Sequence, residues 1–133
     1  MAAEATPATP SRLRLGVGVL LVGHGLIHAL GPLDIWGITD IEALTGEPTI
    51  DFGPSATDVL AGVWLLALAL FVAAGLAVLM RRGWWRPVAV VGVLVSQFVV
   101  ILWWNDAAAG TIPNLLIVGA ILYAPRMQLR FNT

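Results

Sequence analysis

Apolar residues are concentrated in four long runs, and polar and charged residues gather in the segments between them. The runs cover residues 13–33, 58–80, 87–104 and 111–124. Because about 20 apolar residues in a helix cross a bilayer core of about 30 Å, the first three runs are long enough to span, and the fourth is short at about 21 Å. We expect the fourth helix either to include part of residues 107–110 or to end below the headgroups. The pattern predicts an all-α protein, a bundle of four transmembrane helices.

The two ends of the chain lack this apolar character. Residues 1–11 are small, polar and proline-containing, which predicts a disordered tail, and residues 127–133 form a second tail behind a membrane domain over 12–126. Arg12 and Arg14 precede the first run as in a signal peptide, but the run is too long for one and ends without an A-x-A cleavage pattern. We therefore expect the first run to be a retained helix.

The composition indicates lipid as the surrounding solvent. Hydrophobic residues make up 59% of the 133 residues, charged residues only 11%, and the mean hydropathy is +0.89. About a quarter of the residues of a soluble domain are charged, so this chain has too few to cover a surface in water. The sequence has no cysteine, which excludes disulfides, thiolate ligands and a cysteine nucleophile. It also has no glycine-rich phosphate loop, nucleophile motif or basic patch, so we expect no nucleic-acid partner.

The charges predict the orientation in the membrane. All seven basic residues are arginines, and four spans place all of them on one side. They are Arg12, Arg14, Arg81, Arg82, Arg86, Arg126 and Arg130. Seven of the eight acidic residues fall on the other side, and only Glu4 joins the arginines. Since basic loops stay in the cytoplasm, both termini are predicted to be cytoplasmic in a multi-pass protein of the plasma membrane.

Two connecting segments carry further signals. Between the second and third runs, "RRGWWRP" (residues 81–87) offers a glycine for the turn, tryptophans for the membrane interface and a proline for a first helical turn. The first outer loop, residues 34–57, is 24 residues long, and a loop of that length often has a function. Within it we expect a short helix near residues 39–46, with Thr39 or Asp40 as the N-cap.

The candidate chemistry begins with "LVGHGLIHALGPLD" (residues 21–34), which holds the only two histidines, His24 and His28. Residues four apart share a helix face. Counting about 1.5 Å per residue from the inner arginines puts His24 about 15 Å into the membrane and His28 about 21 Å, in the outer half. Small residues on this helix, including Gly25 and Ala29, allow close packing. A central first helix would then present both histidines to the third and fourth helices.

Other polar residues reach the same depth from other helices. Ser96 and Gln97 are level with His24, and Asn114 is about 18 Å into the membrane. Asp106 follows the third run, at the outer mouth. We therefore predict a polar pocket in the outer half of the bundle. Its candidate residues are His24, His28, Ser96, Gln97, Asp106 and Asn114.

Two interpretations of the histidines stay open. Two imidazoles at positions i and i+4 can hold one metal ion, with Asp106 or Asp58 as the nearest type of third ligand. Haem is unfavourable, because its axial ligands approach from opposite faces. Alternatively, neutral histidines bond to Gln97, Ser96, Asn114 or backbone carbonyls and lock the bundle, each interhelical contact contributing about 0.6 kcal/mol. We favour a shared polar pocket or lock over a metal site, although an ionisable group inside a membrane is a functional candidate by default.

Two motifs resemble those of a family of small four-helix bacterial membrane proteins, mostly uncharacterised and distantly DoxX-like. The family pattern is H-G-L-I-H-x-x-G early in the chain and S-Q, W-x-D-A and G-T-x-x-N late, and the likeness covers most of residues 15–124. The matching positions are His24, His28, Gly31, Ser96, Gln97, Trp104, Asp106, Gly110, Thr111 and Asn114. The outer loop, residues 34–57, is longer than in the compact family form. The resemblance implies a four-helix fold and, through DoxX-like proteins, a link to quinone-coupled redox chemistry.

Three functions are consistent with these features. The favoured one is a small-ligand-binding or accessory subunit whose polar pocket organises the bundle. The second is a membrane redox subunit with a quinone or metal beside the histidines. The third is an oligomeric transporter of small solutes or ions, because four helices in one chain leave little room for a pore. The lipid bilayer is the expected partner, together with a homo-oligomer or a larger membrane complex, and no residue pattern specifies a reaction or a cofactor.

Overall fold

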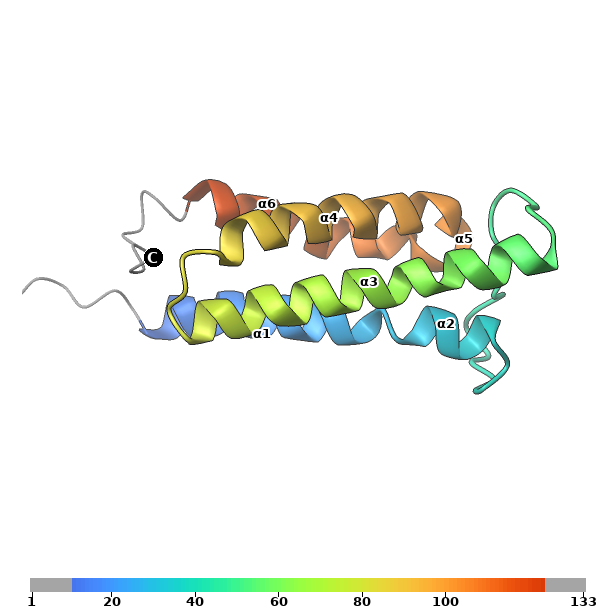
Figure 1. Cartoon of the computed structure of the whole chain (residues 1–133), viewed down its shortest axis with the longest axis horizontal. Coiled ribbons are helices and arrows are strands. Elements are labelled where there is room, and N and C mark those ends of the chain that lie inside the picture. The colour runs from blue at the N-terminus through green and yellow to red at the C-terminus, as the bar shows by residue number, and fades with distance from the viewer. Residues whose placement is uncertain (1–10, 124–133) are drawn as a thin grey trace, which may run out of the picture.

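The computed structural model describes residues 11–123, and all regular secondary structure within that range is helical. The elements are α1 (Ser11–Ile27), α2 (Leu30–Ile35), α3 (Pro54–Leu79), α4 (Trp85–Leu102), α5 (Trp104–Ala107), the 3-10 turn η1 (Ala108–Gly110) and α6 (Thr111–Tyr123). The long helices run along one axis in an elongated bundle (Figure 1). Four segments are long and apolar enough to cross a membrane: Arg12–Ile35, Pro54–Leu79, Trp85–Leu102 and Trp104–Tyr123. The prediction of an all-α bundle with four spans is confirmed.

The predicted helix boundaries differ from the observed ones in specific places. The predicted tails and the predicted helix end at residue 124 lie outside the described residues, except that Ser11 already belongs to α1. Helix α3 starts at Pro54 rather than at residue 58, because a proline is well suited to a first helical turn. The fourth span gains the expected length on its outer side, where α5 and η1 continue into α6.

The first span is two helices rather than the single predicted one. At the break, His28 N–H bonds to Gly25 O and Ala29 N–H to Leu26 O, both at 3.0 Å, which tightens the turn. Pro32 lies four residues after His28 and has no N–H with which to bond the His28 carbonyl. The missing hydrogen bond ends α1, and α2 then starts at Leu30.

The first span packs closely on α3 through glycines, as predicted for a thinned first helix. A Cβ atom at Gly75 would lie 3.0 Å from Gly18 O and 3.0 Å from Val22 N, and one at Gly25 would lie 2.9 Å from Phe71 Cβ. Side chains at these positions would force the two backbones apart. Not every glycine has this role, because a Cβ at Gly16 or Gly23 would have no neighbour within 4 Å.

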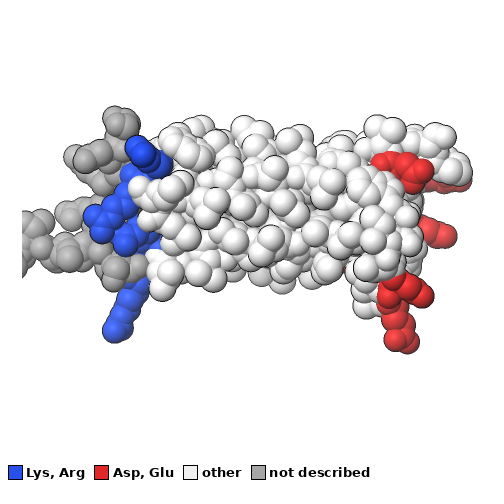
Figure 2. Space-filling view, turned by 60° about the horizontal axis from the view of Figure 1, so that its bottom comes forward, with Lys and Arg blue, Asp and Glu red and all other residues white. Residues whose placement is uncertain are grey.

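The outside of the bundle is apolar along its length and charged at its two ends. Large hydrophobic side chains face outward, among them Leu94 at 66% and Leu115 at 65% exposure. Such a surface is unfavourable in water and matches lipid. Figure 2 shows arginines at one end of the molecule and acidic residues at the opposite end. Arg86 donates from Nη2 to Ile121 O at 3.2 Å, so it also joins α4 to the end of α6.

The turn between α3 and α4 uses a different residue from the one expected. The sequence pointed to the glycine of "RRGWWRP", but Arg81 is the residue with a positive φ, of 58°. Arg81 N–H bonds to Val78 O at 3.0 Å and Arg82 N–H to Ala77 O at 2.7 Å. These two bonds form a Schellman motif, which satisfies the last carbonyls of α3 and places an arginine where glycine is usual.

The part of the outer loop between α2 and α3 is held to the bundle and contains no helix, so the prediction of a helix near residues 39–46 is wrong. The Asp34 carboxylate accepts the Ile41 N–H at 2.9 Å, and Asp106 accepts the N–H groups of Thr45 and Gly46 at 3.0 and 2.9 Å. Carboxylates of the bundle accept these backbone N–H groups, which in a helix would bond to backbone carbonyls. Within residues 39–46 only one turn forms, where Leu44 N–H bonds to Ile41 O.

Candidate functional site

His28 owes its place to the break in the first span. Its backbone N–H bonds to Gly25, so the His24 carbonyl loses the partner that a continuous helix would supply. The His28 ring replaces that partner, because Nδ1 donates to His24 O at 2.8 Å. A carbonyl can only accept, so Nδ1 carries a hydrogen and the ring orientation is fixed. The site therefore begins with a side chain that caps its own helix.

The two histidines belong to a closed ring of hydrogen bonds with Ser96 of α4 and Asn114 of α6. His28 Nε2 lies 2.9 Å from Ser96 Oγ, Ser96 Oγ donates to Asn114 Oδ1 at 3.1 Å, and His24 Nε2 lies 2.9 Å from the same Oδ1. All four side chains are buried, with 5% exposure or less. We call these four residues the histidine ring. It joins three of the spans near their middle depth.

Gln97 extends the histidine ring toward the start of α6. Asn114 Nδ2 donates to Gln97 Oε1 at 3.0 Å, and Gln97 Nε2 donates to Thr111 Oγ1 at 3.2 Å. The Thr111 hydroxyl, at the start of α6, thus accepts a bond from α4. Five of the six candidate residues are thus brought together in one network, as the shared depth predicted.

The hydroxyl hydrogen of Ser96 has two acceptors within reach. It can serve either Asn114 Oδ1 or His28 Nε2, but not both. Since His28 carries its hydrogen on Nδ1, Nε2 of the neutral ring can accept from Ser96, and Asn114 then accepts from His24 alone.

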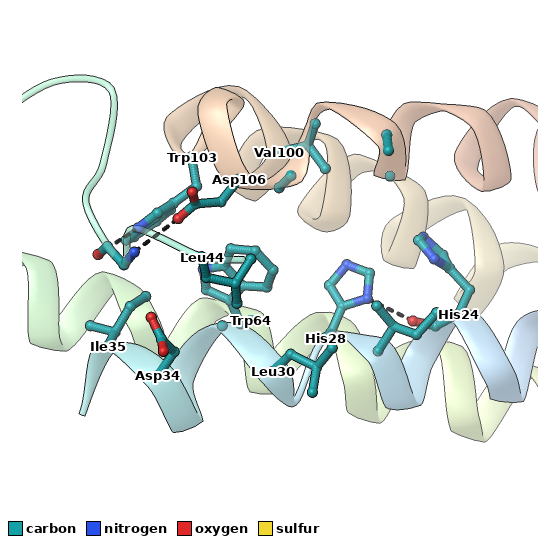
Figure 3. A pocket seen from close by; sticks show the side chains of 16 residues that line it. His24, His28, Leu30, Asp34, Ile35, Leu44, Trp64, Val100, Trp103 and Asp106 are labelled. Atoms are coloured by element: carbon teal, nitrogen blue, oxygen red, sulfur yellow. Dashed lines mark hydrogen bonds between the residues drawn. The ribbon is translucent and has the colours of Figure 1, made fainter. Parts of the chain in front are cut away.

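A pocket of about 200 Å³ opens on the outer side of the histidine ring. Its walls come from α1 and α2, Trp64 of α3, Val100 and Trp103 of α4, the α5–η1 segment, and Leu44 and Gly46 of the outer loop. Figure 3 shows the histidines at the inner end of the pocket. Asp34 of α2 and Asp106 of α5 lie at its outer end, next to the outer loop. We call this space the outer pocket. Its lining is mainly apolar, and its polar groups lie at its two ends.

Aromatic rings stiffen the inner part of the outer pocket. Trp64 and Trp103 meet edge to face with 5.7 Å between ring centroids, and Trp64 lies 5.8 Å from His28. Trp64 fits only because Gly31 has no side chain, since a Cβ there would come 2.6 Å from the indole. Phe71 packs against both histidines from α3, at 4.9 and 5.6 Å.

Asp106 lies apart from the histidine ring. Both of its oxygens bind the outer loop, through Thr45 Oγ1 at 3.0 and 3.1 Å and through the backbone N–H groups of Thr45 and Gly46. Trp103 Nε1 donates to Gly46 O at 3.3 Å, and Trp104 N–H bonds to Thr49 Oγ1 at 3.1 Å. Asp106 thus fastens the loop over the outer pocket, and its role here is positioning.

The metal interpretation lacks a third ligand in the described part of the chain. Residues 11–123 contain no group of three or more His, Cys, Asp or Glu side chains placed to hold a metal ion. Asp58, one of the two candidate third ligands, lines a separate hollow near Pro48 and Pro54. His28 also uses both ring nitrogens in hydrogen bonds.

The sequence did not single out several residues of the outer pocket. Trp64, Asp34 and Leu44 line it, and they come from α3, α2 and the loop. For Trp64 a signal existed, because Gly31 and Trp64 both lie in the outer halves of neighbouring spans and a glycine opposite a tryptophan suggests packing. For Leu44 no periodic pattern was available, since its position depends on the fold of the loop.

No protein-family model, curated protein or solved structure matches the chain. Function is therefore inferred from the geometry of the outer pocket and the histidine ring.

Proposed function

We propose that this chain is an integral protein of the plasma membrane that binds a small, largely apolar molecule in the outer pocket. The observation that carries the proposal is a pocket of about 200 Å³ directly above a buried hydrogen-bond network. The four apolar spans support the membrane location. The arginines at one end support an orientation with that end in the cytoplasm, which opens the pocket to the outside.

The size of the outer pocket limits the ligand. A cavity of about 150 Å³ lined by apolar side chains is large enough for benzene. The outer pocket, at about 200 Å³, has room for one ring with a short substituent. The apolar walls favour burial of a ring, and the polar groups at both ends supply orientation, which is the usual design of a small-molecule site.

A purely structural role explains the histidine ring but not the outer pocket. A lock of the bundle needs the hydrogen bonds among three spans, and these are complete without any space above them. The loop contacts through Asp106 and Thr49 hold a cover in place over that space. We infer that the histidine ring forms the floor of a binding site and that the outer loop is its cover.

Filling the pocket from the loop tests this function. Leu44→Trp places a large side chain at a lining position without changing the packing of the spans, and Ala43→Trp places the same side chain at an exposed neighbour that does not line the pocket. We expect a small molecule to co-purify with the wild type and with Ala43→Trp, and to decrease at least tenfold in Leu44→Trp. Mass spectrometry of solvent extracts measures this, and equal contents in all three would contradict the proposal.

The same extracts address the redox alternative. Membership in the DoxX-like family and a quinone-linked role remain proposals that the motifs of the two segments support. A quinone that co-purifies with the wild type and with Ala43→Trp, but decreases in Leu44→Trp, would favour the redox subunit. A molecule without redox activity would favour the simple ligand-binding subunit.

A further inference from the structure

We propose that the outer pocket selects a small organic cation, a protonated amine attached to a ring or a short apolar group. This inference rests on the proposed function and names the ligand class of that site. The cation assignment follows from which hydrogen-bond donors, acceptors and charges of the pocket lining the protein already uses.

The side-chain donors of the lining are not available to a ligand. Four lining side chains carry N–H groups: His24, His28, Trp64 and Trp103. The two histidines donate within the histidine ring and its carbonyl cap, and Trp103 Nε1 donates to Gly46 O. Trp64 Nε1 is buried and has no partner among the described residues, so it is sealed from the pocket space. A ligand that offers only acceptors would lose its hydrogen bonds to water and gain none.

The acceptors of the lining are partly free. His24 binds Asn114 through Nε2, and Nδ1 has no hydrogen-bond partner within residues 11–123. His24 lines the inner end of the pocket, so Nδ1 is the acceptor that this residue can offer there. At the other end, Asp34 uses Oδ1 for Ile41 N–H, and its Oδ2 accepts no hydrogen bond from the described residues. The pocket thus offers acceptors at both ends.

The charge of the lining favours a cation over a neutral donor. Asp34 and Asp106 line the pocket, and the lining contains neither lysine nor arginine. The arginines that the structure describes lie at the opposite end of the bundle (Figure 2). Trp64 and Trp103 also line the pocket, and indole rings are favourable neighbours of a positive charge. The carboxylates and the indole rings therefore favour an ammonium group, and the apolar walls favour a small apolar body.

The test compares four probes of similar size on the purified protein in dodecyl maltoside at pH 8. Benzylamine is the cation, benzyl alcohol the neutral donor, acetophenone the acceptor and benzoate the anion. We expect calorimetry to show benzylamine binding at least tenfold more tightly than each of the others. Equal or tighter binding of acetophenone, benzyl alcohol or benzoate would overturn the cation assignment, while it would leave a ring-binding pocket in place.

A matched pair of variants locates the charge. Asp34→Asn keeps an oxygen for Ile41 N–H and removes the charge, and Asp40→Asn removes the same charge from an exposed loop position outside the pocket. Benzylamine should bind about five- to tenfold more weakly to Asp34→Asn and unchanged to Asp40→Asn. Equal weakening in both would overturn the assignment, since it would show only a general surface field. No binding of any of the four probes to the wild type would contradict the proposed function itself.

The amine can be a free molecule or a lipid headgroup, and a further arm separates these sources. Addition of phosphatidylethanolamine to the micelles supplies an ammonium headgroup. Competition with benzylamine assigns the site to the headgroup. Unchanged benzylamine binding assigns it to a free amine, and either result requires the same ammonium chemistry.

Discussion

Asn114 is the residue on which the histidine ring depends most. It accepts from His24 and Ser96 through Oδ1 and donates to Gln97 through Nδ2, and its exposure is only 2%. Without it, three polar side chains in the middle of the bundle would each lose a partner. Buried polar groups without a partner are costly in an apolar environment.

Replacement of this residue should therefore lower stability. We expect Asn114→Ala to decrease the free energy of unfolding by about 1–2 kcal/mol, since a single interhelical hydrogen bond contributes about 0.6 kcal/mol on average. Thermal unfolding in maltoside, followed by circular dichroism, measures the change. Asn105→Ala, an exposed position of α5, is the control and should alter stability by less than about 0.5 kcal/mol. Equal stability of the two variants would argue against a structural role for the histidine ring.

The regular helices could be predicted from the sequence more readily than the breaks and loops between them. Depth counted at a fixed rise per residue placed Ser96, Gln97 and Asn114 level with the histidines, because these three residues lie in uninterrupted helices, α4 and α6. The break at His28 was not predicted, since it needs a side chain that bonds a carbonyl of its own helix. Pro32 was visible in the sequence, but its effect is felt four residues earlier.

The outer pocket shows the same limit on what a sequence can predict. Its floor was predicted from the histidines and their partners. Its walls were not, because they depend on contacts of the loop with Asp34 and Asp106, and these have no periodic signal. The acidic residues of the loop region were interpreted as charges on the outer side, whereas two of them also determine how the loop backbone folds.

The turn after α3 contains a residue in an unfavourable backbone conformation. Arg81 adopts the left-handed conformation, which costs a residue with a Cβ atom about 1 kcal/mol relative to glycine. Arg81→Gly should raise the free energy of unfolding by about that amount. Arg82→Gly, the adjacent position without a positive φ, removes the same charge and is expected to be neutral or mildly destabilising. Chemical unfolding in mixed micelles measures both, and a loss of stability in Arg81→Gly would contradict the assignment of strain.

For the whole molecule, the separation of charge predicts the orientation in the membrane. Because the natural chain has no cysteine, single cysteines report on one position at a time. Arg82→Cys should resist a membrane-impermeant maleimide in intact cells and react after lysis. Glu47→Cys, at the exposed acidic end, should react in intact cells. Labelling of position 82 in intact cells would contradict the proposed orientation. The outer pocket would then open toward the cytoplasm.

Because the outer pocket lies along the axis of the bundle, the membrane potential affects the binding of a charged ligand that moves into it. A positively charged group that enters from the outside and reaches His28 at the inner end of the outer pocket, roughly 21 Å up a core of about 30 Å, crosses about a quarter of the hydrocarbon thickness, whereas a group held beside Asp34 stays at the outer end. One elementary charge moved across the full membrane at 100 mV corresponds to about 2.3 kcal/mol, so a quarter of that path contributes about 0.6 kcal/mol, or roughly a threefold change in affinity. An energised cell, negative inside, would therefore hold such a molecule more tightly than a depolarised one, although the protein itself does not change shape.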